Sequence, residues 1–167
     1  MGALVKVIDS VLFLFFVVIA VLVPLINAQA CLPASLFPEF MVELKAWYER
    51  ESGDYLIAQK PHFFVGLLWH ELLFQWPLVL ANLYGILASK RWFNTTCLIY
   101  GVSVIAAVSA ILSELIGSGK ASDKLIILHY PFVGMGVLAT LRGLLPQSSK
   151  TASTVGKGPA LGRKKRV

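Results

Sequence analysis

Residues 62–87 read HFFVGLLWHELLFQWPLVLANLYGIL, an apolar run long enough for a helix to cross a bilayer. About 20 residues, at about 1.5 Å per residue, span the ~30 Å of hydrocarbon. Glu71 lies near the middle of this run, and Gln75 lies one helical turn further on. A charged side chain at membrane depth costs at least ~2.5 kcal/mol. We therefore expect Glu71 to face a protein interior or a cavity, which makes it the strongest functional signal in the sequence.

Three further apolar runs predict more spans, at about 10–30, 92–116 and 125–145. The chain has 167 residues, of which 57% are hydrophobic and 14% charged, whereas a soluble domain is typically ~25% charged. Helices satisfy their own backbone hydrogen bonds in lipid. The sequence thus predicts an all-α integral membrane bundle of four transmembrane helices in one domain, residues 1–146, followed by a disordered basic cytosolic tail at 147–167.

The first run has an alternative interpretation as a signal peptide. Lys6 precedes an apolar core, and Ala28-Gln29-Ala30 is similar to a cleavage site. However, the positively charged region is thin and carries Asp9. We favour a retained helix, because its removal would leave three spans and place the tail on the opposite side from the amino terminus.

The distribution of Lys and Arg orients the four spans, because cytosolic loops are enriched in these residues. The amino terminus, the 90–91 loop and the carboxyl-terminal segment together hold ten of them, against five on the other side. We therefore expect a multi-pass membrane protein with both termini cytosolic.

The last four residues, 164–167, read KKRV and place Lys164 and Lys165 fourth and third from the end. Lysines in these positions of a cytosolic tail form an endoplasmic reticulum retrieval signal, which coat proteins bind. The alternative is a basic tail that contacts anionic lipid headgroups. Nucleic acid is not an expected partner.

The loop between the first two spans is predicted to contain a short amphipathic helix after Pro38. Its Phe40, Leu44, Trp47 and Tyr48 recur at helical spacing. Trp and Tyr are typical of the membrane interface, so we expect this helix to lie on or over the bundle on the lumenal side.

Polar side chains from all four spans are expected at a similar depth. We predict that they line one cavity in the lumenal half of the bundle, between helices bent by proline. Other roles are open. Glu71 and Gln75 would then form hydrogen bonds that hold helices together, Glu114 would lie in water at the interface, and His129 would bond to a backbone carbonyl. The residues of this predicted cavity are Asn27, Glu71, Glu114 and His129, and the prolines are Pro24, Pro77 and Pro131.

Several motifs resemble the sigma-2-receptor-like branch of the EXPERA (emopamil-binding-protein-like) family. Residues 71–77, ELLFQWP, are similar to the second-span motif of that branch, and the resemblance covers about residues 10–145. It implies an endoplasmic reticulum protein, often a homodimer, with a lipid-accessible pocket that binds sterols and a role in sterol homeostasis or trafficking. The other matching segments are 32–33, 36–38, 44–48, 54, 92, 100 and 111–113.

The resemblance also implies roles for individual residues. In the family the pocket holds two acids; the second-span acid maps to Glu71, with Gln75 beside it, and a pocket tyrosine maps to Tyr100. The first-span acid is replaced by Asn27, which offers hydrogen bonds but no ion pair. We therefore expect weakened binding of cationic amines, and we hypothesise that Glu114 partly replaces the missing charge. As a buried acid, Glu71 is expected to donate a hydrogen bond to Asn27 or to a sterol hydroxyl.

The resulting ligand-binding set is Asn27, Glu71, Gln75, Tyr100, Glu114 and His129. The favoured function is sterol or lipid binding without chemistry, with neither a cofactor nor a metal. Another branch of the family contains sterol Δ8–Δ7 isomerases, which need an acid and a base on opposite sides of the sterol. The sequence does not reproduce that constellation at matching spacing. A membrane adaptor that binds other proteins is the third reading.

Overall fold

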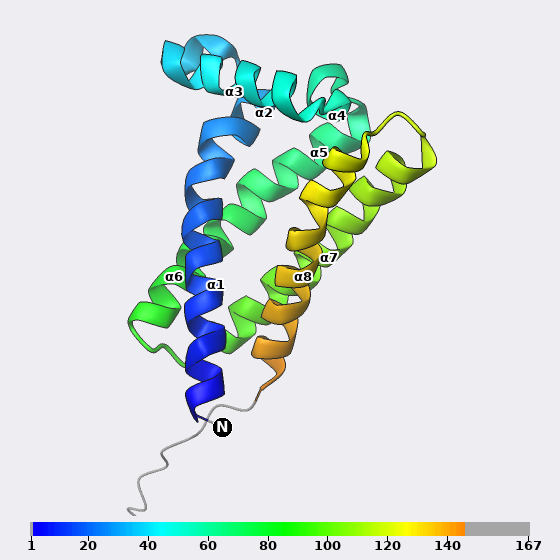
Figure 1. Ribbon diagram of the computed structural model, residues 1–167. Coiled ribbons are helices and arrows are strands. Elements are labelled where there is room, and N and C mark those ends of the chain that lie inside the picture. Colours follow the sequence, from blue (N-terminus) through cyan, green and yellow to red (C-terminus); the bar gives the residue numbers. More distant parts are fainter. Residues whose placement is uncertain (1, 146–167) are drawn as a thin grey trace, which may run out of the picture.

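The computed structural model describes residues 2–145, and within them the chain is built from helices and short connections (Figure 1). Four helical segments are long and apolar enough to cross a membrane. This confirms the predicted all-α membrane fold. The segments are α1 (Gly2–Leu22) with η1 (Val23–Asn27) and α2 (Ala28–Cys31), then α5 (His62–His70) with η3 (Glu71–Gln75) and α6 (Trp76–Leu87), then α7 (Phe93–Gly117) and α8 (Asp123–Leu144).

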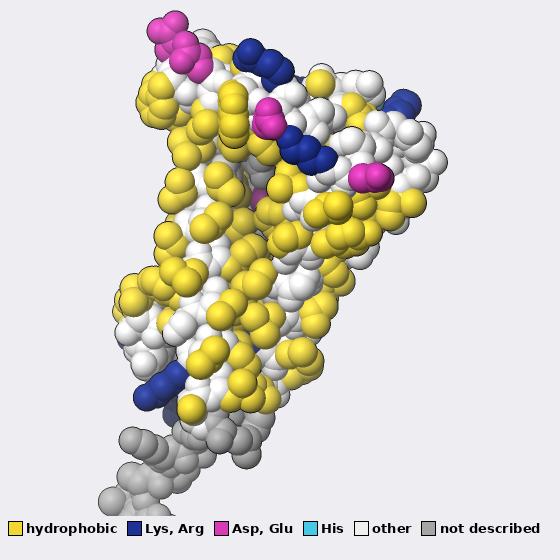
Figure 2. All heavy atoms as spheres, in the orientation of Figure 1, with side chains coloured by type: hydrophobic (Ala, Val, Ile, Leu, Met, Phe, Trp, Pro, Cys, Tyr) yellow, Lys and Arg dark blue, Asp and Glu magenta, His cyan; other side chains and the backbone are white. Residues whose placement is uncertain are grey.

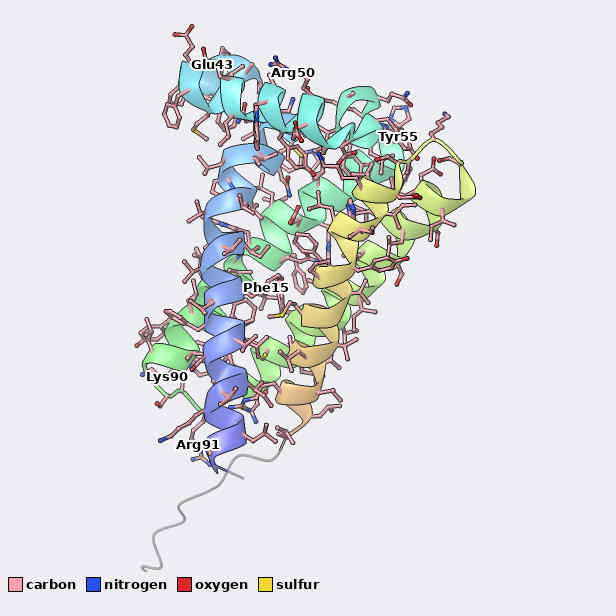
Figure 3. The ribbon with its side chains drawn as sticks, viewed as in Figure 1. Phe15, Glu43, Arg50, Tyr55, Lys90 and Arg91 are labelled. Atoms are coloured by element: carbon pink, nitrogen blue, oxygen red, sulfur yellow. The ribbon has the colours of Figure 1, made fainter. Side chains whose placement is uncertain are left out.

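The first helix begins at Gly2, earlier than the expected start near residue 10. Residues 3–9, ALVKVID, include neither Pro nor Gly, so no residue interrupts the helix before its apolar core. The basic tail with Lys164 and Lys165 lies outside the described residues. Figure 3 shows Lys90 and Arg91 at the end of the bundle where α1 begins and α8 finishes, opposite Glu43 and Arg50.

A cap crosses the other end of the bundle. It consists of η2 (Ala34–Leu36), α3 (Glu39–Ser52) and α4 (Tyr55–Gln59), and Figure 1 shows α3 running across the upper end of α1. The helix α3 follows Pro38 and ends at Gly53, whose φ of 64° is the left-handed conformation that favours glycine at a helix carboxyl end. The predicted amphipathic helix is therefore present, with Phe40 and Trp47 exposed.

The helices α7 and α8 pack closely because glycines remove side chains from their interface. A Cβ atom added to Gly101 would lie 2.5 Å from the backbone nitrogen of Thr140 and 2.7 Å from the carbonyl oxygen of Gly136. Gly143 has a similar approach to α7, since its Cβ would lie 2.6 Å from the backbone nitrogen of Leu98. Backbone atoms cannot move aside as a flexible side chain can, so these glycines set the distance between the two helices.

We expect Gly101→Ala to lower the free energy of unfolding by about 2 kcal/mol, because the added methyl group overpacks this interface. Gly66→Ala is the matched control, since nothing lies within 4 Å of a Cβ at Gly66 in α5. Denaturant unfolding in detergent micelles would measure both. Equal midpoints for the two variants would contradict the assigned role of Gly101.

The helices α1 and α8 meet at the end opposite the cap and diverge towards it (Figure 1). Half-way along, Phe15 of α1 contacts Phe132 of α8 edge-on, with ring centroids 6.1 Å apart; Figure 3 labels Phe15. At the closed end, Arg142 donates from Nε to Asp9 Oδ1 (2.5 Å) and from Nη2 to Asp9 Oδ2 (3.2 Å). Its Nη1 donates to Asn94 Oδ1 (2.9 Å), so one buried side chain joins α1, α7 and α8.

Candidate functional site

A cavity of about 210 Å³ lies where α1 and α8 diverge below the cap. Figure 2 shows a hollow between these two helices with an acidic side chain visible in its depth. Apart from five polar side chains the lining is apolar. The polar members are Asn27, Tyr48, Asp54, Glu71 and His129, and the apolar ones include Ile19, Leu22, Val23, Ile26, Phe64, Leu68, Val108, Ile111, Leu128 and Phe132.

Two π-helical turns supply the polar centre of the cavity. The turn η1 ends with Asn27, and the turn η3 begins with Glu71. The turn η1 contains Pro24, and Pro77 follows η3 in the first turn of α6. Proline cannot donate a backbone hydrogen bond to the residue four positions earlier. The carbonyl of Ala20, which Pro24 leaves without this donor, accepts from Trp76 Nε1 at 3.1 Å. Proline and a side chain from the neighbouring span thus explain how the helix departs from the α form here.

Asn27 and Glu71 contact each other across these turns. Asn27 Nδ2 donates to Glu71 Oε2 at 2.7 Å. The pairing matches the expectation, but its direction is reversed, because the amide rather than the acid is the donor. The bond joins the first and second spans within segments apolar enough to cross a membrane, where an isolated acid is costly.

Three residues of the predicted ligand-binding set lie outside the lining of this cavity. Gln75 Nε2 donates to Ser103 Oγ of α7 at 2.9 Å. Tyr100 is buried with its ring edge-on to Phe16, at 5.1 Å between centroids. Glu114 Oε1 accepts from the hydroxyl of Tyr55 in the cap at 3.3 Å.

The placement of Glu114 corrects the expectation that it shares a cavity with Asn27, Glu71 and His129. Its bond to Tyr55 ties the end of α7 to the cap instead. The hypothesis that Glu114 replaces the missing first-span acid therefore has no geometric basis. The residue before Glu71, His70, also lies elsewhere: its Nε2 is 3.3 Å from Ser103 Oγ, in a separate groove between the second span and α7.

His129 has two features that the sequence left as alternatives. Its Nδ1 lies 2.9 Å from the carbonyl oxygen of Leu125, one turn earlier in α8. Its ring also lines the cavity and lies 6.4 Å from the ring of Phe132, between centroids. A histidine bonded to its own helix thus also lines the cavity.

Asp54 lines the cavity although the predicted set omitted it. It caps α4, where its Oδ1 accepts from the backbone nitrogens of Leu56 at 3.0 Å and Ile57 at 3.4 Å. Burial raises the pKa of Asp54 above its ordinary value of 3.8, although the two backbone hydrogen bonds act in the opposite direction. Tyr48, which lines the same side, has its pKa raised to about 12 by burial. The signal in the sequence that could have pointed to Asp54 is that aspartate is a preferred residue at the amino-terminal cap of a helix, here α4.

Asp54→Ala should lower the free energy of unfolding by about 1 kcal/mol through loss of the cap, whereas Asp54→Asn should keep the cap. The raised pKa adds a pH dependence. Between pH 3.8 and the raised pKa the folded protein binds a proton that the unfolded chain does not, so stability rises as the pH falls through this window. Unfolding midpoints measured against pH should therefore rise at low pH for the wild type relative to Asp54→Asn. Parallel pH profiles would contradict this assignment.

With this geometry established, comparison with known proteins identifies the family. Residues 40–142 match the model of EBP, described as EXPERA (EXPanded EBP superfamily). The chain belongs to the EXPERA family. The matched EXPERA segment runs from α3 to near the end of α8, so it contains Glu71 and His129, whereas Asn27 lies before it.

Named relatives agree with the resemblance seen in the sequence motifs. The chain is 35% identical over 88 residues to "Sigma intracellular receptor 2" of Homo sapiens and of Macaca fascicularis, covering 52% of this chain and 50% of each relative. It is 26% identical over 125 residues to the protein of that name in Xenopus tropicalis, covering 74% of this chain and 73% of the relative. The chain thus spans about half the length of the human and macaque relatives, and it is a sigma-2-receptor-like EXPERA protein.

Proposed function

We propose that this EXPERA protein binds sterols or related lipids in the cavity between α1 and α8. The observation that carries the proposal is a largely apolar cavity with a hydrogen-bonded acid, Glu71, at membrane depth. Leu128 lines the cavity and is also 42% exposed, and Figure 2 shows a hollow between α1 and α8, which supports an opening on a side that would face lipid. A ligand can therefore enter from the bilayer without crossing water.

The size of the cavity limits how the ligand is held. At about 210 Å³ it is smaller than the ~300–1,000 Å³ of pockets that enclose a drug-sized ligand. It exceeds the ~150 Å³ of an apolar cavity that binds benzene. One end of a sterol, with its polar group, therefore fits inside, while the remainder extends through the opening between α1 and α8 into lipid.

The cellular role we propose follows the family: sterol homeostasis or trafficking in the endoplasmic reticulum, with cytosolic termini, a possible homodimer and retrieval through Lys164 and Lys165. Replacing both lysines with alanine should release a tagged full-length protein from the endoplasmic reticulum. Continued residence there would mean that coat proteins do not read this signal, and it would leave the binding proposal unaffected.

Sterol entry is tested by narrowing the opening. Leu128→Trp should reduce labelling of purified protein by a photoreactive sterol about tenfold, because the larger ring fills the wall of the cavity. Ile127→Trp is the matched control; Ile127 is the preceding residue of α8, is 62% exposed and does not line the cavity. Mapping of the labelled peptide should place the label on α1 or α8. Equal labelling of both variants, or a label confined to other helices, would contradict the proposed site.

The same preparation distinguishes binding from catalysis. We expect a Δ8-sterol to be recovered unchanged after incubation with protein that is labelled by the photoreactive sterol. Appearance of the Δ7 isomer, lost in Glu71→Gln, would overturn the proposal of binding without chemistry. Undetectable sterol binding combined with retained capture of partner proteins by Glu71→Gln would favour the adaptor reading.

A further inference from the structure

We infer that His129 accepts the hydrogen bond of the ligand's hydroxyl group, so that the cavity selects neutral amphiphiles that donate over those that only accept. This inference rests on the proposed function and names the chemical class of ligand within it.

The tautomer follows from one contact. Nδ1 of His129 lies 2.9 Å from the carbonyl oxygen of Leu125. A carbonyl oxygen has no hydrogen to donate, so Nδ1 must carry the proton. In a neutral imidazole the other nitrogen, Nε2, is then an acceptor with a free lone pair. The hydrogen bond to Leu125 also limits rotation of the ring, which holds Nε2 in a defined direction.

Nε2 is available to a ligand. Within residues 2–145, no protein group donates a hydrogen bond to it, and it is not among the buried unpaired polar atoms of this part of the chain. The ring lines the cavity together with Leu128 and Phe132. An acceptor in apolar surroundings gains from a donor that arrives with the ligand, because without one its lone pair has no partner.

The other polar side chains of the cavity already have hydrogen-bond partners within the protein for some of their atoms. Asn27 Nδ2 donates to Glu71 Oε2 at 2.7 Å, so the two side chains are partners before any ligand binds. Asp54 is likewise engaged by the backbone nitrogens at the start of α4. The remaining oxygens of Glu71, Asn27 and Asp54 can accept as well, but each belongs to a side chain that already has a partner. His129 Nε2 is the accepting atom on the α8 wall beside Leu128 and Phe132, and a hydroxyl is the neutral group that supplies the matching donor.

A matched pair of ligands tests this inference. Cholesterol and its 3-keto counterpart have nearly the same shape, but the ketone cannot donate. Each would compete against a photoreactive sterol for the purified full-length protein. We expect the wild type to prefer the hydroxyl compound about fivefold, the size of one neutral hydrogen bond. His129→Leu should bind both equally, and His62→Leu, at an exposed histidine outside the cavity, should keep the preference.

A second measurement does not depend on any variant folding. In wild-type protein labelled with ¹⁵N-histidine, the Nε2 resonance of His129 should have the chemical shift of an unprotonated nitrogen and move when cholesterol binds, but not when the ketone binds. A preference that survives in His129→Leu, or an Nε2 that carries the proton, would overturn the inference while leaving sterol binding intact. Failure of the wild type to bind either compound would instead overturn the proposed function.

Discussion

Asp9→Leu should lower the free energy of unfolding by about 3 kcal/mol or more, because it leaves the guanidinium of Arg142 buried without its carboxylate. The two side chains are only 24% and 9% exposed, and the pair joins the first and last spans. Arg142→Met should cost a similar amount by leaving Asp9 unpaired. Denaturant unfolding of purified protein in micelles would measure both changes.

The double variant Asp9→Leu with Arg142→Met tests whether the two side chains stabilise the fold through their interaction with each other. It should recover most of the stability lost by either single change, because no unpaired charge remains. Glu51→Gln is the control, since Glu51 and Lys124 form an exposed ion pair at 2.6 Å, and exposed pairs contribute little. Additive losses in the double variant would show that Asp9 and Arg142 do not act together.

Asn27→Asp should increase the affinity for a cationic amphiphilic amine about a hundredfold, or ~2.8 kcal/mol. The structure brings Asn27 to within 2.7 Å of Glu71 in a low-dielectric cavity, so an acid at position 27 would supply the carboxylate that pairs with an ammonium. Competition of the amine against a photoreactive sterol in wild-type and variant protein would measure the difference.

Two controls sharpen this prediction. Glu114→Gln should leave amine affinity unchanged, because Glu114 contacts Tyr55 at the cap and does not line the cavity. Cholesterol affinity should change much less than amine affinity in Asn27→Asp, since a neutral ligand forms no ion pair. No gain in amine affinity in Asn27→Asp would show that position 27 does not face the ligand. A loss of amine affinity in Glu114→Gln would show that Glu114 belongs to the binding site.

The cap and the spans contribute differently to the site. The spans supply Asn27, Glu71 and His129, whereas the cap supplies Tyr48 and Asp54. Two part-buried hydrogen bonds join the cap to the spans, from Tyr55 to Glu114 of α7 and from Gln29 of α2 to the carbonyl of Met41 at 2.8 Å. The exposed pair of Glu51 with Lys124 of α8 adds little to this. The cap that closes one end of the cavity is therefore hydrogen-bonded to the spans.

The sequence by itself determined the four spans and the amphipathic helix after Pro38, and it singled out Glu71, which lines the cavity. These are local properties: the mean hydropathy of a 20-residue window, the period of apolar residues, and the cost of an acid in a long apolar run. The resemblance added the family, and the family model matched over residues 40–142 agrees with it.

Only the tertiary structure decided which polar side chains converge. Gln75 lies four residues from Glu71, yet the two bond to different helices, α7 and η1, across a π-helical turn that no window of sequence revealed. From the sequence, Arg142 was one of the ten Lys and Arg residues of the cytosolic side; in the structure it is buried against Asp9, at the opposite end of the chain. The physical reason is that convergence depends on the rotation and tilt of each helix, and these follow from packing between residues far apart in sequence.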